Sequence, residues 1–311
     1  MFSQPTHGTQ KDFLMNFETF IQHALNSLTL GSLYALVAIG YTMVYGILRL
    51  INFAHSEIFM LGAYFVFWGT TLFALPWPLA IALSIAFTAG LGIMVDRIAY
   101  RPLRDAPRIS ALISSIGVSF FLQNVAIVFF QAIPRAVYRP EWLENPIIMG
   151  NVRVLPITLF VPVLSVLLML GLVYIVYRTK TGLGMRAISK DIETSYLMGV
   201  PVNRVIAITF GIGSALAAAS GIMWALRYPQ LQPIMGAVPG FKAFIAAVFG
   251  GIGSIQGAVV GGVTLGFIEI MTVAFFPDLA GYRDAFAFVL LIAILLVKPT
   301  GLFGAKAEEK V

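Results

Sequence analysis

Few residues in this chain carry the side chains that catalysis or metal binding requires. Its 311 residues include no cysteine and only three histidines, His7, His23 and His55. The lack of cysteine excludes disulfides, thiolate catalysis and Cys-type metal sites. A metal site near His55 would need more ligands than His55 and Glu57, and an intramembrane enzyme would need a nucleophile beside a base. The sequence therefore predicts no catalytic residue and no metal site.

The short polar segment Arg49-Leu-Ile-Asn-Phe-Ala-His-Ser-Glu57 separates two long apolar stretches. Polar groups are costly inside a membrane and often belong to a transport pathway. We therefore predict that Asn52, His55 and Glu57 line a translocation pathway. The alternative is a short solvated turn that caps a helix beginning near Ser56.

A second polar segment, residues 189–201, also lies between apolar stretches and has basic flanks. Residues 191–198 are predicted to form a short helix that Gly199 ends, with Asp191 and Glu193 near its positive end. Such a helix can bind a groove of a soluble partner, and the alternative is a simple connector between spans. The predicted partner contacts are Glu193, Thr194, Ser195 and Gly199, flanked by Arg186 and Lys190.

Glycines with helix-packing spacing follow further along the chain. Gly257 and Gly261 form one GxxxG pair, and Gly262 and Gly266 form another. Because this spacing lets helix backbones approach closely, we predict that these four glycines pack helices together.

The neighbouring cluster of Gly250, Gly251 and Gly253 predicts a break in a helix, which we assign to the same translocation pathway. A dinucleotide-binding fingerprint would need a glycine at position 256, which is Gln, and a Walker A loop occurs nowhere. The chain is therefore expected to have no nucleotide site of its own.

The composition places these segments in a membrane. Apolar residues make up 59% of the chain, charged residues make up 11%, and the mean hydropathy is +0.90. Windows of roughly 20 apolar residues can cross a bilayer, and helices satisfy their own backbone hydrogen bonds in lipid. We expect a single all-α domain, 1–311, that forms a polytopic membrane bundle of about eight or nine spans with broken or re-entrant segments. The expected spans lie near 21–47, 57–75, 79–97, 109–133, 156–177, 205–226, 255–275 and 284–298.

The basic residues predict the orientation. Loops 97–108 and 178–204 and the region of the tail, 299–311, carry more than half of the 20 Lys and Arg residues. The positive-inside bias assigns them to the cytoplasm and explains the net charge of +6 without a nucleic-acid partner. Loop 134–155 is expected on the opposite side.

Two consequences follow from this orientation. An even number of crossings must separate loop 97–108 from the tail, so the Pro- and Gly-rich segment 228–250 has to supply one, as a broken or re-entrant helix. The polar N-terminal extension, 1–16, has no cleavable signal pattern and lies outside if the first three spans cross completely.

Several motifs resemble the branched-chain amino acid ABC permease family, and are most similar to its H-type subunit. The segment from Glu193 to Gly199 resembles the Glu-Ala-Ala-x-x-x-Gly coupling loop of ABC importers, with Thr-Ser in place of Ala-Ala. The more specific likeness lies in other segments and runs from about residue 20 to the C-terminus. These segments are 28–46, Ile51-Asn-Phe-Ala-His-Ser-Glu57, Ala99-Tyr-Arg-Pro-Leu-Arg104, Val248-Phe-Gly-Gly-Ile-Gly-Ser254 and Pro299-Thr-Gly-Leu-Phe-Gly304.

The resemblance implies a permease subunit of an ATP-driven importer in the bacterial cytoplasmic (inner) membrane. It implies a second homologous permease, two ATP-binding subunits that hold ATP and Mg²⁺, and a periplasmic substrate-binding protein. The chain itself would hold no cofactor, and residues 178–204 would form its cytoplasmic coupling loop. Urea and short-amide permeases share much of this pattern and remain an alternative.

The other alternative is a self-contained channel or secondary transporter. Glu269 is the one acid that the sequence places well inside a span, apart from Glu57 near an end. Ion coupling usually uses several intramembrane acids or bases, so this alternative has little support.

Overall fold

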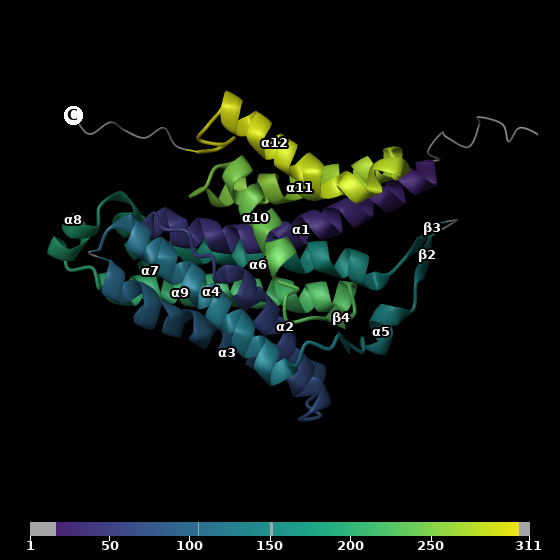
Figure 1. The fold of residues 1–311 in the computed structure, drawn as a ribbon, viewed down its shortest axis with the longest axis horizontal. Coiled ribbons are helices and arrows are strands. Elements are labelled where there is room, and N and C mark those ends of the chain that lie inside the picture. The colour runs from purple at the N-terminus through teal and green to yellow at the C-terminus, as the bar shows by residue number, and fades with distance from the viewer. Residues whose placement is uncertain (1–16, 105, 150–151, 305–311) are drawn as a thin grey trace, which may run out of the picture.

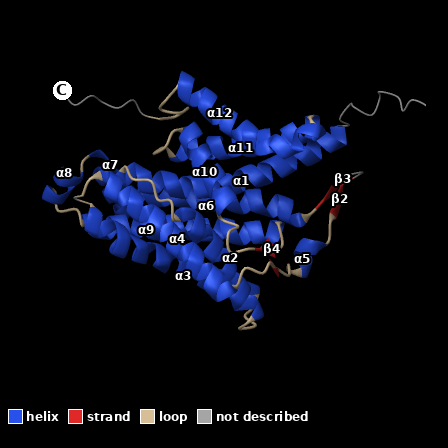
Figure 2. Cartoon of the chain, in the orientation of Figure 1, coloured by secondary structure: helices blue, strands red, loops and turns tan. Residues whose placement is uncertain are grey.

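Long helices form most of this protein in the computed structural model, which describes residues 17–104, 106–149 and 152–304. The predicted extension, 1–16, and part of the predicted tail, 305–311, lie outside this range. Figure 2 shows that the few strands lie at one end of the helical body. The helices are α1 (Phe17–Leu48), α2 (His55–Thr71), α3 (Trp77–Val95), α4 (Arg108–Phe130), α5 (Glu141–Glu144), α6 (Pro156–Arg178), α7 (Lys180–Lys190), α8 (Ile192–Leu197), α9 (Val202–Arg227), α10 (Ala237–Gly250), α11 (Ile255–Phe275) and α12 (Arg283–Val297). A π-helical turn (Asp96–Tyr100) and a 3₁₀ turn (Arg101–Leu103) extend α3, and a second 3₁₀ turn (Pro277–Tyr282) precedes α12. The strands are β1 (Arg135–Ala136), β2 (Ile147–Met149), β3 (Val152–Val154) and β4 (Gln230–Leu231).

Seven helical segments of the described chain are long and apolar enough to cross a membrane, and two shorter helices, α2 and α10, accompany them. The predicted all-α polytopic bundle of about eight or nine spans is therefore confirmed. The seven segments are Phe17–Leu48, Trp77–Leu103, Ile109–Phe130, Pro156–Arg178, Val202–Arg227, Ile255–Phe275 and Pro277–Val297.

The two shorter helices lie in the predicted span 57–75 and in the predicted broken segment 228–250. At 1.5 Å per residue, the 17 residues of α2 and 14 residues of α10 extend about 26 and 21 Å, less than the ~30 Å hydrocarbon core. A non-helical segment precedes each, residues 49–54 before α2 and residues 228–236 before α10. Each segment thus joins a non-helical stretch to a helix, which agrees with the broken or re-entrant helix expected for 228–250.

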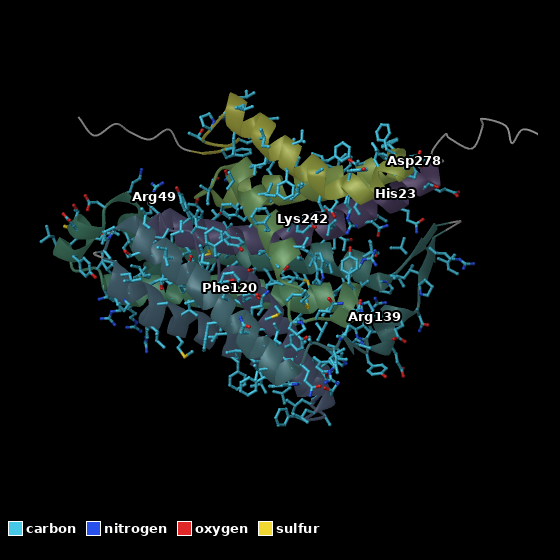
Figure 3. All side chains as sticks on the ribbon, in the orientation of Figure 1. His23, Arg49, Phe120, Arg139, Lys242 and Asp278 are labelled. Atoms are coloured by element: carbon cyan, nitrogen blue, oxygen red, sulfur yellow. The ribbon has the colours of Figure 1, made fainter. Side chains whose placement is uncertain are left out.

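The molecule has two distinct ends, seen at opposite sides of Figure 1. At the end that we call the basic end, Arg104 donates a hydrogen bond to Asn203 Oδ1 over 2.5 Å, so the two basic loops lie together beside α7 and α8. At the other, the strand end, β1 pairs with β4, β2 pairs with β3, and Gln22 Nε2 approaches the Arg153 carbonyl oxygen at 3.5 Å. Figure 3 labels Arg49 toward the basic end, His23 and Asp278 toward the strand end, and Lys242 between them.

These contacts account for the crossing that parity requires. The segment 228–250 leaves the strand end at β4 and finishes at Gly250. There the backbone N–H groups of Leu302 and Phe303 donate to the carbonyl oxygens of Phe249 and Gly250, at 3.0 and 2.8 Å. Residues at the start of the tail therefore close the open C-terminal end of α10.

The core is built around α1 and α9. The most apolar windows of these helices are 89% and 83% buried, whereas that of α12 is 6% buried. The long helices α1 and α9 run in opposite directions, and each precedes a break and one of the two shorter helices. Helices α3, α4, α6 and α12 surround this centre and present apolar faces outward, as a lipid environment requires.

Candidate functional site

The segment α7–α8 projects from the basic end (Figure 1). Thr179 caps α7 by accepting the Gly182 N–H at 3.1 Å, and Asp191 Oδ1 caps α8 by accepting the Thr194 N–H at 3.0 Å. Gly199 ends α8 with φ +76°, the left-handed conformation that glycine adopts most readily. The short helix lies close to the predicted range, 191–198.

The side chains at the end of α8 divide into surface and interior groups. Glu193, Thr194 and Gly199 are exposed, as are Arg186 and Lys190 on α7. Ser195 is buried, and its hydroxyl donates to the Asp191 carbonyl oxygen at 2.6 Å, so its visible role is internal.

Two large apolar side chains that the sequence analysis did not select dominate this tip. Leu197 is 87% exposed and Met198 is 77% exposed. We call Glu193, Leu197, Met198 and Gly199 the α8 tip. Apolar side chains presented so fully at a charged end of the molecule are typical of a protein contact surface. The sequence signal was present, since Leu197 and Met198 are adjacent apolar residues just before Gly199 in the polar segment 189–201.

The three predicted pathway residues Asn52, His55 and Glu57 gather at the start of α2. All three are buried. Tyr100 donates its hydroxyl to Asn52 Oδ1 at 2.9 Å, and the ring of His55 meets the edge of Tyr41 with centroids 4.7 Å apart. In the part of the chain that the structure describes, Asn52 Nδ2, His55 Nε2 and Glu57 Oε2 have no hydrogen-bond partner.

The start of α10 meets this same place. Gly236 and Gly240 lie against Ser56, where an added Cβ atom would collide with that residue. Phe244 of α10 packs on Tyr41, with ring centroids 5.8 Å apart. The two shorter helices, α2 and α10, therefore begin beside each other, and buried polar atoms without partners lie at their junction.

The structure does not bring Gly250, Gly251 and Gly253 to this junction. They form the opposite, C-terminal end of α10 and the turn after it, where Gly250 and Gly251 contact residues 301–304 and Gly253 lies beside Gly46 of α1. Gly251 and Gly253 have φ values of +105° and +99°, and their observed role is to end α10 and turn the chain into α11.

The four glycines with GxxxG spacing lie at helix crossings. Gly257 approaches Gly250, and Gly261 approaches Ala246, so both face α10. Gly262 and Gly266 face α1, where an added Cβ atom would meet the backbone of Ala35 and Gly31. A crossing this close leaves no room for a side chain.

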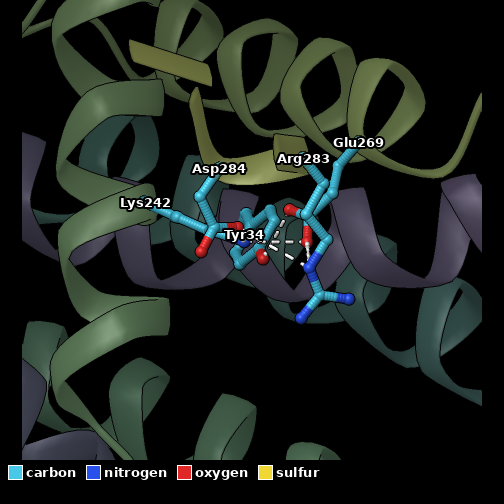
Figure 4. Close-up of polar contacts among 5 residues, drawn as sticks. All are labelled: Tyr34, Lys242, Glu269, Arg283 and Asp284. Atoms are coloured by element: carbon cyan, nitrogen blue, oxygen red, sulfur yellow. Dashed lines mark hydrogen bonds and ion pairs between the residues drawn. The ribbon is translucent and has the colours of Figure 1, made fainter. Parts of the chain in front are cut away.

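An ion cluster with the buried pair Lys242 and Glu269 at its centre joins four helices, and Figure 4 shows it. Lys242 Nζ of α10 lies 2.7 Å from Glu269 Oε1 of α11 and 2.7 Å from Asp284 Oδ1 of α12. Tyr34 of α1 donates its hydroxyl to Glu269 Oε2 at 2.9 Å, and Arg283 Nε lies 3.6 Å from both carboxylates. Buried charges are stable in such a place only when they are paired.

Sequence reasoning identified Glu269 but missed Lys242. The available signal was one lysine within the otherwise apolar segment 237–250, which by itself requires an acid nearby. The residues that the structure describes contain no group of three His, Asp or Glu side chains arranged as a metal site.

Comparison with known proteins identifies the family. Residues 23–295 match the family described as "Branched-chain amino acid transport system / permease component". The high-affinity branched-chain amino acid transport system permease protein BraD of Pseudomonas aeruginosa is 42% identical, over 94% of this chain and 98% of the relative. The protein LivH of Escherichia coli K12, which carries the same description, is 39% identical over 95% and 99%.

A more distant relative is the ribose import permease protein RbsC of Escherichia coli K12, 26% identical over 61% of this chain and 59% of the relative. No solved structure was found to match. The match to the family covers most of the chain, and the multi-pass helical body agrees with it. The chain therefore belongs to the branched-chain amino acid transport system permease family, whose members are membrane transport components rather than enzymes and work with other transporter subunits.

Proposed function

We propose that this chain is a permease subunit of an ATP-driven importer that carries branched-chain or related apolar amino acids across the cytoplasmic (inner) membrane. A second, homologous permease completes the membrane part, and two ATP-binding subunits hold ATP and Mg²⁺. A periplasmic binding protein delivers the substrate to the strand end. The substrate in this proposal comes from the names of the relatives BraD and LivH.

The observation that carries the coupling part of the proposal is the α8 tip. Leu197 and Met198 are almost fully exposed, and Glu193 lies on the same short helix. The tip stands on the end of the molecule that the basic loops assign to the cytoplasm. A small apolar surface with one acidic group can enter a groove of an ATP-binding subunit, and movement of that subunit would then reach α9 through the α7–α8 segment.

Reconstitution of the complete transporter tests this function. Proteoliposomes with all subunits, binding protein and internal ATP should accumulate leucine, and those lacking ATP should not. Leucine entry by the chain alone, without ATP, would instead support a channel or secondary transporter. Uptake of urea or acetamide in preference to leucine would support a short-amide permease.

The coupling surface has its own test. Substitution of both Leu197→Ser and Met198→Ser should reduce co-purification of the ATP-binding subunits. Substitution of Phe73→Ser, a 65% exposed residue in the loop before α3, is the matched control and should leave co-purification unchanged.

Gly199→Arg should uncouple ATP hydrolysis from uptake. The φ of +76° at Gly199 disfavours any residue with a side chain, so the turn after α8 would be strained. Since no atom lies within 4 Å of an added Cβ, the arginine side chain would also extend outward from the α8 tip. Normal uptake and normal ATPase stimulation in this variant would remove Gly199 from the coupling surface.

A further inference from the structure

A cavity of about 240 Å³ lies beside the ion cluster, toward the strand end. Residues of α1, α11 and the start of α12 line it, together with Arg227 and Tyr228 at the end of α9. A space of this size can hold a small metabolite.

The charges around the cavity favour a carboxylate. Arg227 and Arg283 both line it, and Glu269 is the one acid among its described lining residues. Lys242, which is not among the lining residues, pairs with Glu269 at 2.7 Å and also with Asp284. Arg227 and Arg283 therefore present two cations to the cavity against the single carboxylate of Glu269, which favours a carboxylate group as part of the ligand.

The two guanidinium groups have capacity for a ligand. Arg227 donates from Nη2 to Asn26 Oδ1 at 3.1 Å and lies over the ring of Tyr228, which orients the group without supplying a negative charge. Arg283 approaches the acids through Nε, and Figure 4 shows its two terminal nitrogens turned away from Glu269. Guanidinium groups bind carboxylates through paired N–H donors, so this arrangement suits an α-carboxylate.

The rest of the wall suits the other parts of an amino acid. Leu33, Ile270 and Val273 supply apolar surface. The Glu269 carboxylate, 5% exposed, lies at the wall where it can attract an ammonium group. One cavity thus offers cations, an acid and an apolar face within the span of a single small molecule.

We propose that this cavity binds a zwitterionic α-amino acid with an apolar side chain. Its carboxylate pairs with Arg227 and Arg283, its ammonium group faces Glu269, and its side chain packs on Leu33, Ile270 and Val273. The proposal rests on the proposed function and adds to it a substrate site within one permease subunit, next to the helix α10 that the ion cluster holds.

The experiment uses the absence of native cysteine in this chain. Val273→Cys places one thiol in the cavity wall, and Phe275→Cys, on the same helix but not among the lining residues, is the control. The complete transporter is treated with a small methanethiosulfonate reagent, and labelling is read as the mass shift of this chain. At a leucine concentration about ten times the dissociation constant, labelling at position 273 should slow about ten-fold and labelling at 275 should not change.

Ligand analogues and variants test the assigned contacts. Leucinamide lacks the carboxylate and 4-methylpentanoate lacks the ammonium group, so both should protect position 273 less than leucine does. Each of the variants Arg227→Gln and Arg283→Gln should raise the leucine concentration needed for half-maximal protection by about ten-fold. The conservative variants Arg227→Lys and Arg283→Lys should raise it less. Co-purification of the partner subunits and an unchanged labelling rate without leucine show that each variant still folds.

Equal protection by leucine and leucinamide, or full protection in both Gln variants, would overturn the assignment. Leucine uptake by the same proteoliposomes without any protection at 273 would refute the cavity site and leave the proposed function standing. Protection at position 273 without ATP-driven uptake would support the cavity site and refute the proposed function.

Discussion

Lys242 Nζ and Glu269 Oε1 lie 2.7 Å apart where α10 meets α11. Both side chains are almost completely buried, with 6% and 5% of their surface exposed. Breaking such a pair is costly because one charge remains without a partner. At the scale of single residues, this pair is the strongest constraint on how α10 can sit against α11.

We predict that Glu269→Gln lowers the free energy of unfolding by about 3 kcal/mol, since it leaves Lys242 with Asp284 alone. The exposed substitution Glu141→Gln should change it by less than about 0.5 kcal/mol. Thermal unfolding of the detergent-purified transporter measures both. A melting temperature for Glu269→Gln equal to that of the control would mean that the pair does not stabilise the fold.

His55 provides a second prediction at this scale. Its ring occupies space that only a glycine at position 40 leaves open, and Nε2 would collide with any Cβ atom there. His55→Ala should alter the transport rate while the subunits still co-purify, because the ring lies at the junction of α2 and α10. An unchanged rate would remove His55 from the pathway.

At the scale of elements, the crossing of α1 and α11 depends on Gly262 and Gly266. An added Cβ atom at either position would meet the α1 backbone, and no flexible side chain there can move away. The glycine spacing therefore sets how closely the two helices pack, and with it the place of Glu269 relative to Tyr34.

Gly262→Leu should force α1 and α11 apart and destabilise the protein by about 3 kcal/mol, at the upper end of typical overpacking. Gly171→Leu is the matched control, because Gly171 on α6 has open space around it. Folded yield and melting temperature after purification compare the two. Similar values for both variants would show that the close crossing is not required.

The elements also show what the sequence can reveal. Hydropathy was sufficient for the long spans, because an unbroken apolar helix needs no partner to satisfy its backbone. The start of α2 at His55 lies one residue from the helix start that the sequence suggested near Ser56, whereas the start of α10 at Ala237 was not visible, since it depends on contacts between α2 and α10. Tertiary contact likewise separates the predicted pathway residues: Asn52 and His55 lie at the junction, whereas Gly250 closes against residue 303.

At the scale of the whole molecule, one end is basic and the other holds the strands (Figure 1). The cytoplasm is predicted to contact the basic end because Lys and Arg accumulate in loops on that side. The segments 49–71 and 228–250 each join a non-helical stretch to a helix, and we expect both to carry the chain between the two ends.

Single cysteines test this orientation in a chain without any. A membrane-impermeant maleimide should label Met198→Cys in inside-out vesicles and not in intact spheroplasts. Ile148→Cys, an exposed position on β2, should show the opposite pattern. Labelling of both from the same side would contradict the arrangement of crossings.

The hydrogen bonds from residues 302 and 303 to the end of α10 have a consequence for biosynthesis. The ribosome completes α10 well before it makes those two residues, since α11 and α12 lie between them in the chain. During that interval the carbonyl oxygens of Phe249 and Gly250 must bond to water or to the insertion machinery. The end of α10 can therefore gain these two hydrogen bonds only after synthesis has passed α12 and reached Phe303.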